Sequence, residues 1–151
     1  MNKAERIEFV ISEFRKADIT IDENQADKFV RLCDFMVEYN ENVNLTSITE
    51  FSEVVVKHFV DSVLPFTMVD IPQGSSFIDV GSGAGFPAIP LLICRPDLKG
   101  TLCDSLNKRC VYLEKACELI GVKSEIIHAR SEELGRKKRE CFDFATARAV
   151  A

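Results

Sequence analysis

The stretch that decides the fold is DVGSGAGFP, residues 79–87. Its first residues complete the β-branched and aromatic run FIDV, residues 77–80, which predicts a buried strand. The glycines that follow permit the backbone dihedrals of a tight turn and a close approach to a ligand. Pro87 suits the first turn of a helix that reaches about Cys94. The stretch therefore predicts a strand, a glycine-rich turn and a helix whose N-terminus faces the strand's carboxyl end, where open α/β sheets bind ligands.

The residues that follow repeat this alternation of strands and helices. Further strands are predicted at 101–103, 125–128 and 143–147, with a helix over 107–120 and a short polar helix near Glu132. The β-α-β-α-β-α-β order predicts an α/β fold with a parallel, doubly wound, Rossmann-like sheet and right-handed crossovers. We assign residues 71–151 to this domain.

The residues before the sheet are predicted to be helical. Apolar side chains recur at helical spacing over residues 7–14, and a capping-box pair, Asp22 and Gln25, predicts the start of a second helix. A third helix is predicted from about Ser52 to Leu64, ending at Pro65. Residues 1–70 therefore form a predicted N-terminal helical region.

Composition and charge exclude several classes of protein. Hydrophobic residues make up 46% and charged residues 28% of the 151, which is typical of a globular chain. We expect no membrane association and a cytoplasmic location, because there is no long apolar run and no secretory signal. The net charge of −5 is uneven: residues 1–70 hold 7 basic and 14 acidic side chains, whereas residues 71–151 hold 12 and 10. This asymmetry suggests two regions with different roles.

The six cysteines do not predict a metal site. No two of them form a C-x-x-C pair, and the two histidines, His58 and His128, lie far from any cysteine cluster. We therefore expect no metal, and cysteines that are reduced and mostly in the core.

Two nucleotide ligands are compatible with the glycine-rich turn. Asp104, at the end of the second predicted strand, is placed to bind ribose hydroxyls in either case, although it could instead cap the helix that begins near Ser105. The spacing is G-x-G-x-G and Asp79 precedes it. A carboxylate there is unfavourable beside the pyrophosphate of NAD but favourable beside the ammonium and sulfonium of S-adenosylmethionine. Asp79 thus favours the methyl donor, and an NAD-dependent oxidoreductase is the alternative.

Ordered segments along the chain carry a more specific resemblance. They are NLTSI (44–48), KHFVDS (57–62), residues 79–90, DSLNKR (104–109), RSE (130–132) and TARAVA (146–151). In these segments the chain resembles the bacterial small-subunit (16S) ribosomal RNA guanine-N7 methyltransferases, the glucose-inhibited division protein B family. The resemblance implies a class I methyltransferase sheet, S-adenosyl-L-methionine as cofactor, and 16S rRNA or the 30S subunit as partner.

The resemblance also implies roles for individual residues. Gly81 and Phe86 would line the donor pocket, and Gly83 and Gly85 would shape it. Ser131 and Glu132 would contact the adenine end, and Arg148 would lie beside donor and target. The full predicted cofactor-binding set is Asp79, Gly81, Gly83, Gly85, Phe86, Asp104, Ser131, Glu132 and Arg148. A helix-start acid is the simpler role for Glu132, and a surface ion pair for Arg148.

The reaction implied by the resemblance needs no nucleophile or general base in the protein. Guanine N7 carries an unprotonated lone pair, so the enzyme need only align it with the methyl group and exclude water. Arg148, which could position the target, and the basic run at 136–139 are candidates for phosphate contacts. His58 and Asp61 share one helical face; we expect a structural role before a role near the base.

Two further expectations concern the loop at residues 44–47 and the number of strands. Asn44 and Thr46 are predicted to satisfy the backbone of that loop. Methyltransferases of this class usually have seven strands, and four are predicted here. We therefore expect a C-terminally truncated fragment that can bind the donor without full activity. Its fourth strand would lie at an exposed edge, which favours self-association.

Overall fold

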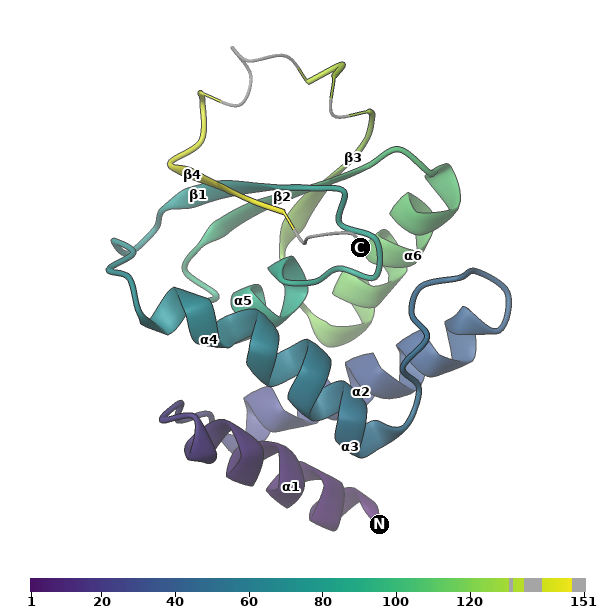
Figure 1. Ribbon diagram of the computed structural model, residues 1–151, viewed down its shortest axis with the longest axis vertical. Helices are drawn as coiled ribbons and strands as arrows, with labels where there is room; N and C mark the ends of the chain where they lie inside the picture. Colours follow the sequence, from purple (N-terminus) through teal and green to yellow (C-terminus); the bar gives the residue numbers. More distant parts are fainter. Residues whose placement is uncertain (131, 135–139, 148–151) are drawn as a thin grey trace.

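The computed structural model describes residues 1–130, 132–134 and 140–147, and within them a parallel four-stranded sheet is the central layer (Figure 1). The strands are β1 (Ser76–Val80), β2 (Lys99–Asp104), β3 (Ser124–His128) and β4 (Phe144–Thr146), in the order β3-β2-β1-β4. All three neighbouring pairs are parallel. The predicted α/β fold and all four strands are confirmed, with ends that differ from the predicted ones by at most two residues.

Helices connect β1 to β2 and β2 to β3, and the first of them follows the glycine-rich turn. Helix α5 (Ala88–Cys94) follows the turn after β1, and helix α6 (Asn107–Ile120) joins β2 to β3. Helix α6 ends as predicted at Gly121, whose positive φ of 69° allows its N–H to reach the last carbonyls of the helix.

The N-terminal region is helical as predicted. Its elements are α1 (Lys3–Lys16), α2 (Glu23–Asn40), α3 (Phe51–Glu53), a π-helix η1 (Val54–Val60) and α4 (Asp61–Thr67). Asp22 and Gln25 form the predicted capping box. These helices lie beneath α5 and α6, on the same side of the sheet (Figure 1). The opposite face of the sheet carries a small apolar cluster around Ile78, Cys103 and Leu134.

The prediction that the third helix ends at Pro65 is wrong. Helical backbone continues from Phe51 through the π-helix to Thr67, with Pro65 inside it. Proline removes one backbone donor, but the turn that follows has other contacts. The Thr67 hydroxyl donates to the carbonyl of Leu64 over 2.7 Å, and the Phe66 ring lies 6.3 Å from that of Phe144 on β4. Packing has overridden the local preference.

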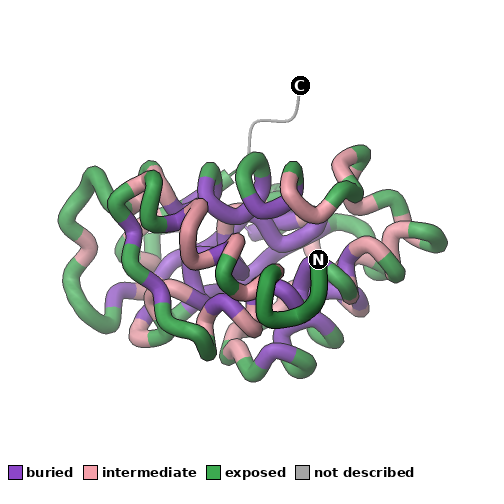
Figure 2. Tube along the Cα trace, turned by 90° about the horizontal axis from the view of Figure 1, so that it is seen from below, coloured by how far each residue is buried: buried purple, intermediate pink, exposed green. Residues whose placement is uncertain are grey.

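One hydrophobic core joins the helical region to the sheet. Figure 2 shows the buried stretches of the chain, in purple, gathered in the interior. A row of buried rings runs from Phe14 through Phe29 and Phe59 to Phe86, with successive centroids 4.9, 4.9 and 6.0 Å apart. The boundary predicted near residue 70 therefore divides the sequence between two parts that share this core. Within the described ranges, no helix combines the length and apolar character needed to cross a bilayer.

Candidate functional site

The glycine-rich turn is attached to the neighbouring strand. The backbone N–H groups of Gly81 and Ser82 both donate to the carbonyl of Cys103 on β2, over 2.9 and 3.0 Å. A side chain on Gly85 would meet Ile89 Cδ1 at 2.5 Å, whereas one on Gly81 would meet nothing within 4 Å. Gly85 is therefore required by close packing. Gly81 leaves an open approach to its backbone.

Asp79 lies behind this turn and is fully buried. Its Oδ2 accepts from the Ser82 hydroxyl and its Oδ1 from the Thr146 hydroxyl on β4, both over 2.7 Å. Burial raises the pKa of Asp79 from 3.8 to about 6, although both hydrogen bonds oppose the shift and the nearby Asp104 adds to it. The carboxyl group thus fixes the turn relative to β4, two elements far apart in the sequence.

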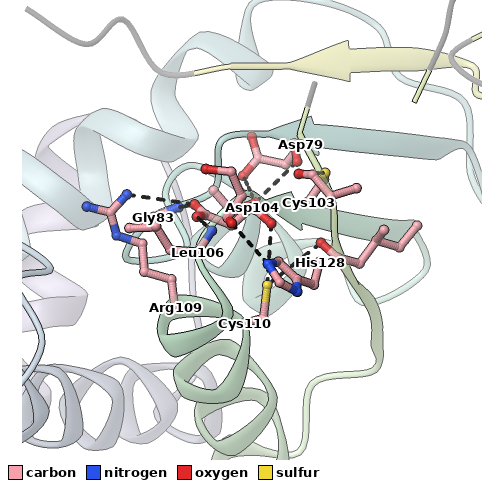
Figure 3. Close-up of polar contacts among 12 residues, drawn as sticks. Asp79, Gly83, Cys103, Asp104, Leu106, Arg109, Cys110 and His128 are labelled. Atoms are coloured by element: carbon pink, nitrogen blue, oxygen red, sulfur yellow. Dashed lines mark hydrogen bonds and ion pairs between the residues drawn. The ribbon is translucent and has the colours of Figure 1, made fainter. Parts of the chain in front are cut away.

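Asp104 holds the same turn from the end of β2 (Figure 3). Its Oδ2 accepts from the Gly83 N–H over 2.8 Å, and its Oδ1 accepts from the Leu106 N–H over 2.9 Å. Arg109 Nη1 lies 4.0 Å from Oδ2. Leu106 is the N-cap of α6, and among the described residues no side chain accepts from the first turn of this helix. The alternative role of Asp104 as the helix cap is therefore wrong, because its Oδ1 accepts from Leu106, ahead of the helix. The same carboxylate also determines where Gly83 lies.

A cavity of about 350 Å³ opens beside these residues at the carboxyl end of the sheet. Its lining residues are Val80, Gly81, Cys103, Ser105, Ala129, Arg130 and Glu132. The volume lies in the range of small-molecule sites. The structure therefore brings together the ends of three strands, β1, β2 and β3, around one hollow.

The predicted cofactor residues take different positions around this cavity. Gly81 and Glu132 line it, whereas Asp79 and Asp104 hold the glycine-rich turn. Phe86 is buried, with its ring stacked on that of His58 at 4.6 Å. Ser131, Arg148 and the basic run at 136–139 lie outside the described residues.

Sequence reasoning missed five residues that line the cavity: Val80, Cys103, Ser105, Ala129 and Arg130. A usable signal was present, since Ser105 directly follows β2 and Ala129 and Arg130 directly follow β3. Carboxyl ends of neighbouring parallel strands meet at one edge.

The cavity fits S-adenosylmethionine on two observations. The backbone at Gly81 is open to a ligand, and the acidic groups Asp79, Asp104 and Glu132 lie around or behind it. In the described part of the chain, no three His, Cys, Asp or Glu side chains gather in a way that could hold a metal ion.

The loop before α3 is organised partly as predicted. The Thr46 hydroxyl accepts from the Ile48 N–H over 3.0 Å. The amide oxygen that accepts from the N–H groups of Leu45 and Thr46 belongs to Asn40, not to Asn44. Asn40 is the last residue of α2. An asparagine at that position is typical of a helix end, so the sequence alone does not indicate that its side chain binds the loop.

A larger cavity, about 580 Å³, lies at the opposite, amino end of the sheet. It is lined mainly by the connection between α4 and β1, together with Phe66, Asp143 and Phe144. None of the predicted cofactor residues that the structure describes lines it. Size alone does not select the site, because the glycine-rich turn and the buried acids lie at the other end.

The family model for rRNA small subunit methyltransferase G matches residues 25–151. The chain belongs to this family. A ribosomal RNA small subunit methyltransferase G of Bacillus subtilis is 45% identical over 148 residues, covering 96% of this chain and 62% of that protein. One from Clostridium perfringens is 46% identical over 132 residues, covering 85% and 55%. The chain thus spans about 62% of the length of the first of these methyltransferase G relatives.

The fold of this methyltransferase G family member is similar to that of a solved structure. That structure is described as a protein-L-isoaspartate O-methyltransferase from Plasmodium falciparum in complex with S-adenosyl-L-homocysteine. The two share 14% sequence identity with a TM-score of 0.58, over 97% of this chain and 74% of the other. At this identity the comparison supports the class I methyltransferase fold alone.

Proposed function

We propose that this protein is an S-adenosylmethionine-dependent methyltransferase that modifies N7 of a guanosine in 16S ribosomal RNA, in the cytoplasm. The observation that carries the proposal is the open backbone at Gly81 beside a cavity at the carboxyl end of the sheet, in a member of the methyltransferase G family. The RNA, or the 30S subunit that contains it, is the proposed partner.

The residues around the cavity have separate proposed roles toward the donor. Gly81 permits close approach to the backbone, and Glu132 lies where the adenine end would be bound, next to Ser131 in the sequence. Asp104 already accepts two N–H groups, but a carboxylate has about four acceptor positions, so ribose hydroxyls can be bound as well. When bound, S-adenosylmethionine supplies a methyl group on a positively charged sulfur.

Asp79 contributes through charge rather than contact. Its carboxyl group is fully buried behind the turn, with both oxygens bonded to hydroxyl groups. With a pKa of about 6 it is mostly ionised at neutral pH. A negative charge in a poorly solvated position favours a cationic ligand nearby.

The proposed reaction requires the protein to align its two substrates and requires no proton transfer by a side chain. Guanine N7 has an available lone pair, so the protein needs to hold the base in line with the methyl group and keep water out. Arg148 and the basic run at 136–139 are proposed to contact the RNA backbone and position the target.

A methyl-transfer assay tests the proposal. The protein is incubated with tritiated S-adenosylmethionine and 30S subunits, and the RNA is then cleaved at N7-methylguanosine by reduction and aniline treatment. We expect label in 16S rRNA and cleavage at one guanosine. Binding of NADH in a calorimetric titration, with no binding of S-adenosylhomocysteine, would instead support the oxidoreductase.

We also propose that β4 mediates self-association. It is an edge strand of the described sheet and contains three residues, Phe144–Thr146. Sedimentation velocity should show a concentration-dependent dimer, and a single monomeric boundary at all concentrations would contradict this.

A further inference from the structure

A chain of contacts leads from the loop at residues 44–48 to the glycine-rich turn, and His58 is its centre. His58 lies in the π-helix η1 and only 8% of its surface is exposed. π-Helical turns often occur at functional sites. The His58 backbone carbonyl accepts from the Ser62 hydroxyl, four residues further along the helix.

The edge and the face of the His58 ring make different contacts. Nε2 lies 2.7 Å from the Thr46 hydroxyl oxygen, so a hydrogen bond joins η1 to the loop. The ring face stacks on Phe86, with centroids 4.6 Å apart and planes inclined by 18°. The imidazole thus contacts the loop and the glycine-rich turn at the same time.

Thr46 is itself held in place. Its hydroxyl accepts from the Ile48 N–H, and its backbone N–H donates to Asn40 Oδ1. The position of Nε2 is therefore set by a loop whose own backbone is fixed from α2.

Phe86 connects His58 to the glycine-rich turn, beside which the donor is proposed to bind. It directly follows Gly85, whose backbone is packed against Ile89 and whose N–H donates to the Ser82 carbonyl over 2.8 Å. Ser82 in turn bonds to Asp79. A shift of the Phe86 ring therefore displaces the turn that carries Gly81, since the packed core offers little free space.

We propose that His58 is a positioning residue for donor binding: through Thr46 and Phe86 it couples the loop at 44–48 to the glycine-rich turn. The proposal rests on the proposed function, because it assigns the donor to that turn. None of the three residues lines the 350 Å³ cavity, so each acts through the turn rather than by contact.

The matched variants Thr46→Val and Thr46→Ser test the coupling. Valine keeps the shape of threonine but removes the hydroxyl, whereas serine keeps the hydroxyl. Calorimetric titration with S-adenosylhomocysteine should show a Kd for Thr46→Val that is weaker by up to about tenfold. Tenfold is the limit reached when the whole free energy of the lost hydrogen bond goes into holding the turn in its binding position. Thr46→Ser should bind within about twofold of the wild type, because the hydrogen bond is retained.

A second pair separates positioning from stability. Ser62→Ala removes a hydrogen bond to the same residue, His58, but not one that leads to the loop. It should lower the urea midpoint and leave the Kd unchanged. His58→Phe keeps the stacking but not Nε2, and should weaken binding as Thr46→Val does.

The outcomes are distinguishable from failure of the proposed function. If wild-type protein does not bind S-adenosylhomocysteine, the proposed function fails. If the wild type binds and folded Thr46→Val binds equally well, the donor site stands and the role of His58 is structural only. Weakened binding that Thr46→Ser restores supports positioning.

Discussion

The two ends of the sheet both use aspartates to hold loops, but in opposite electrostatic settings. At the amino end, Asp97 accepts from the Gly74 N–H and pairs with Arg95 over 2.9 Å near the surface. That hydrogen bond with Arg95 holds the pKa of Asp97 well below its usual range. At the carboxyl end, Asp79 is fully buried between two hydroxyl groups, and burial raises its pKa to about 6.

This difference separates residues that stabilise the fold from residues that prepare a site. An acid beside arginine at the surface stabilises the folded chain. A buried acid held by neutral donors opposes folding once it is ionised. The position of such an acid at the carboxyl end, behind an open glycine turn, is what we expect of a group that favours a bound cation.

The largest expected difference between the two ends is in the free energy of unfolding lost when a glycine is replaced by alanine. Gly85→Ala places a methyl group 2.5 Å from Ile89 and 3.1 Å from Leu113, at a φ of +93°. Gly74→Ala, at a φ of +79°, meets nothing within 4 Å. We expect losses of about 3 kcal/mol at Gly85, from overpacking plus backbone strain, and about 1 kcal/mol at Gly74.

Urea unfolding followed by circular dichroism measures both free energies. Equal losses would show that the turn at the carboxyl end is no more tightly packed than the amino-end loop.

The second prediction concerns pH. Folded protein keeps the Asp79 proton up to about pH 6, whereas the unfolded chain releases it near 3.8. The stability contributed by this group therefore falls as the pH rises from about 4 to 6, by up to about 3 kcal/mol for a two-unit shift. Asp79→Asn should flatten this part of the profile.

Asp97→Asn is the control for Asp79→Asn and has the opposite sign. Because the pKa of Asp97 is lowered, its stabilisation is present above the ordinary value of 3.8 and is lost as the pH falls below it. Asp97→Asn should flatten the profile of unfolding free energy against pH only below about pH 4. Free energies of unfolding measured from about pH 2 to pH 8 check both. Identical profiles would remove the contrast between the two ends.

Much of this arrangement could be predicted from residues 79–87. The strand, the turn and the helix follow from β-branched residues, glycines and a proline placed in that order. The bond between Asp79 and Thr146 could not be predicted, because it joins residues 67 positions apart and depends on the register of β1 with β4.

The same limit applies to the helical region. Its capping boxes are local and were predictable at Asp22. The contact of His58 with Phe86 was not, since it depends on how η1 packs against the turn, and the extension of α4 past Pro65 likewise depends on packing. Local patterns determine elements here, and tertiary contacts determine which side chains meet.

The smallest expected effect is at the amino end of β4. Asp143 Oδ2 accepts from the Ser76 N–H over 2.7 Å at an exposed position. Asp143→Ala should cost about 1 kcal/mol, the value of one such hydrogen bond, and leave donor affinity unchanged. Urea unfolding and calorimetry measure the two quantities. A large loss of affinity would mean that the two ends are not independent.

The most direct test of the carboxyl-end site compares Gly81→Ala with Gly74→Ala. The two glycines have similar φ angles, +70° and +79°, and a methyl group at either meets nothing within 4 Å, so the two variants should be equally stable. Only Gly81 lines the proposed donor cavity. In calorimetric titrations with S-adenosylhomocysteine, we predict wild-type binding for Gly74→Ala and a Kd at least about tenfold weaker for Gly81→Ala. Equal affinities in the two variants, or no binding by the wild type, would contradict the account.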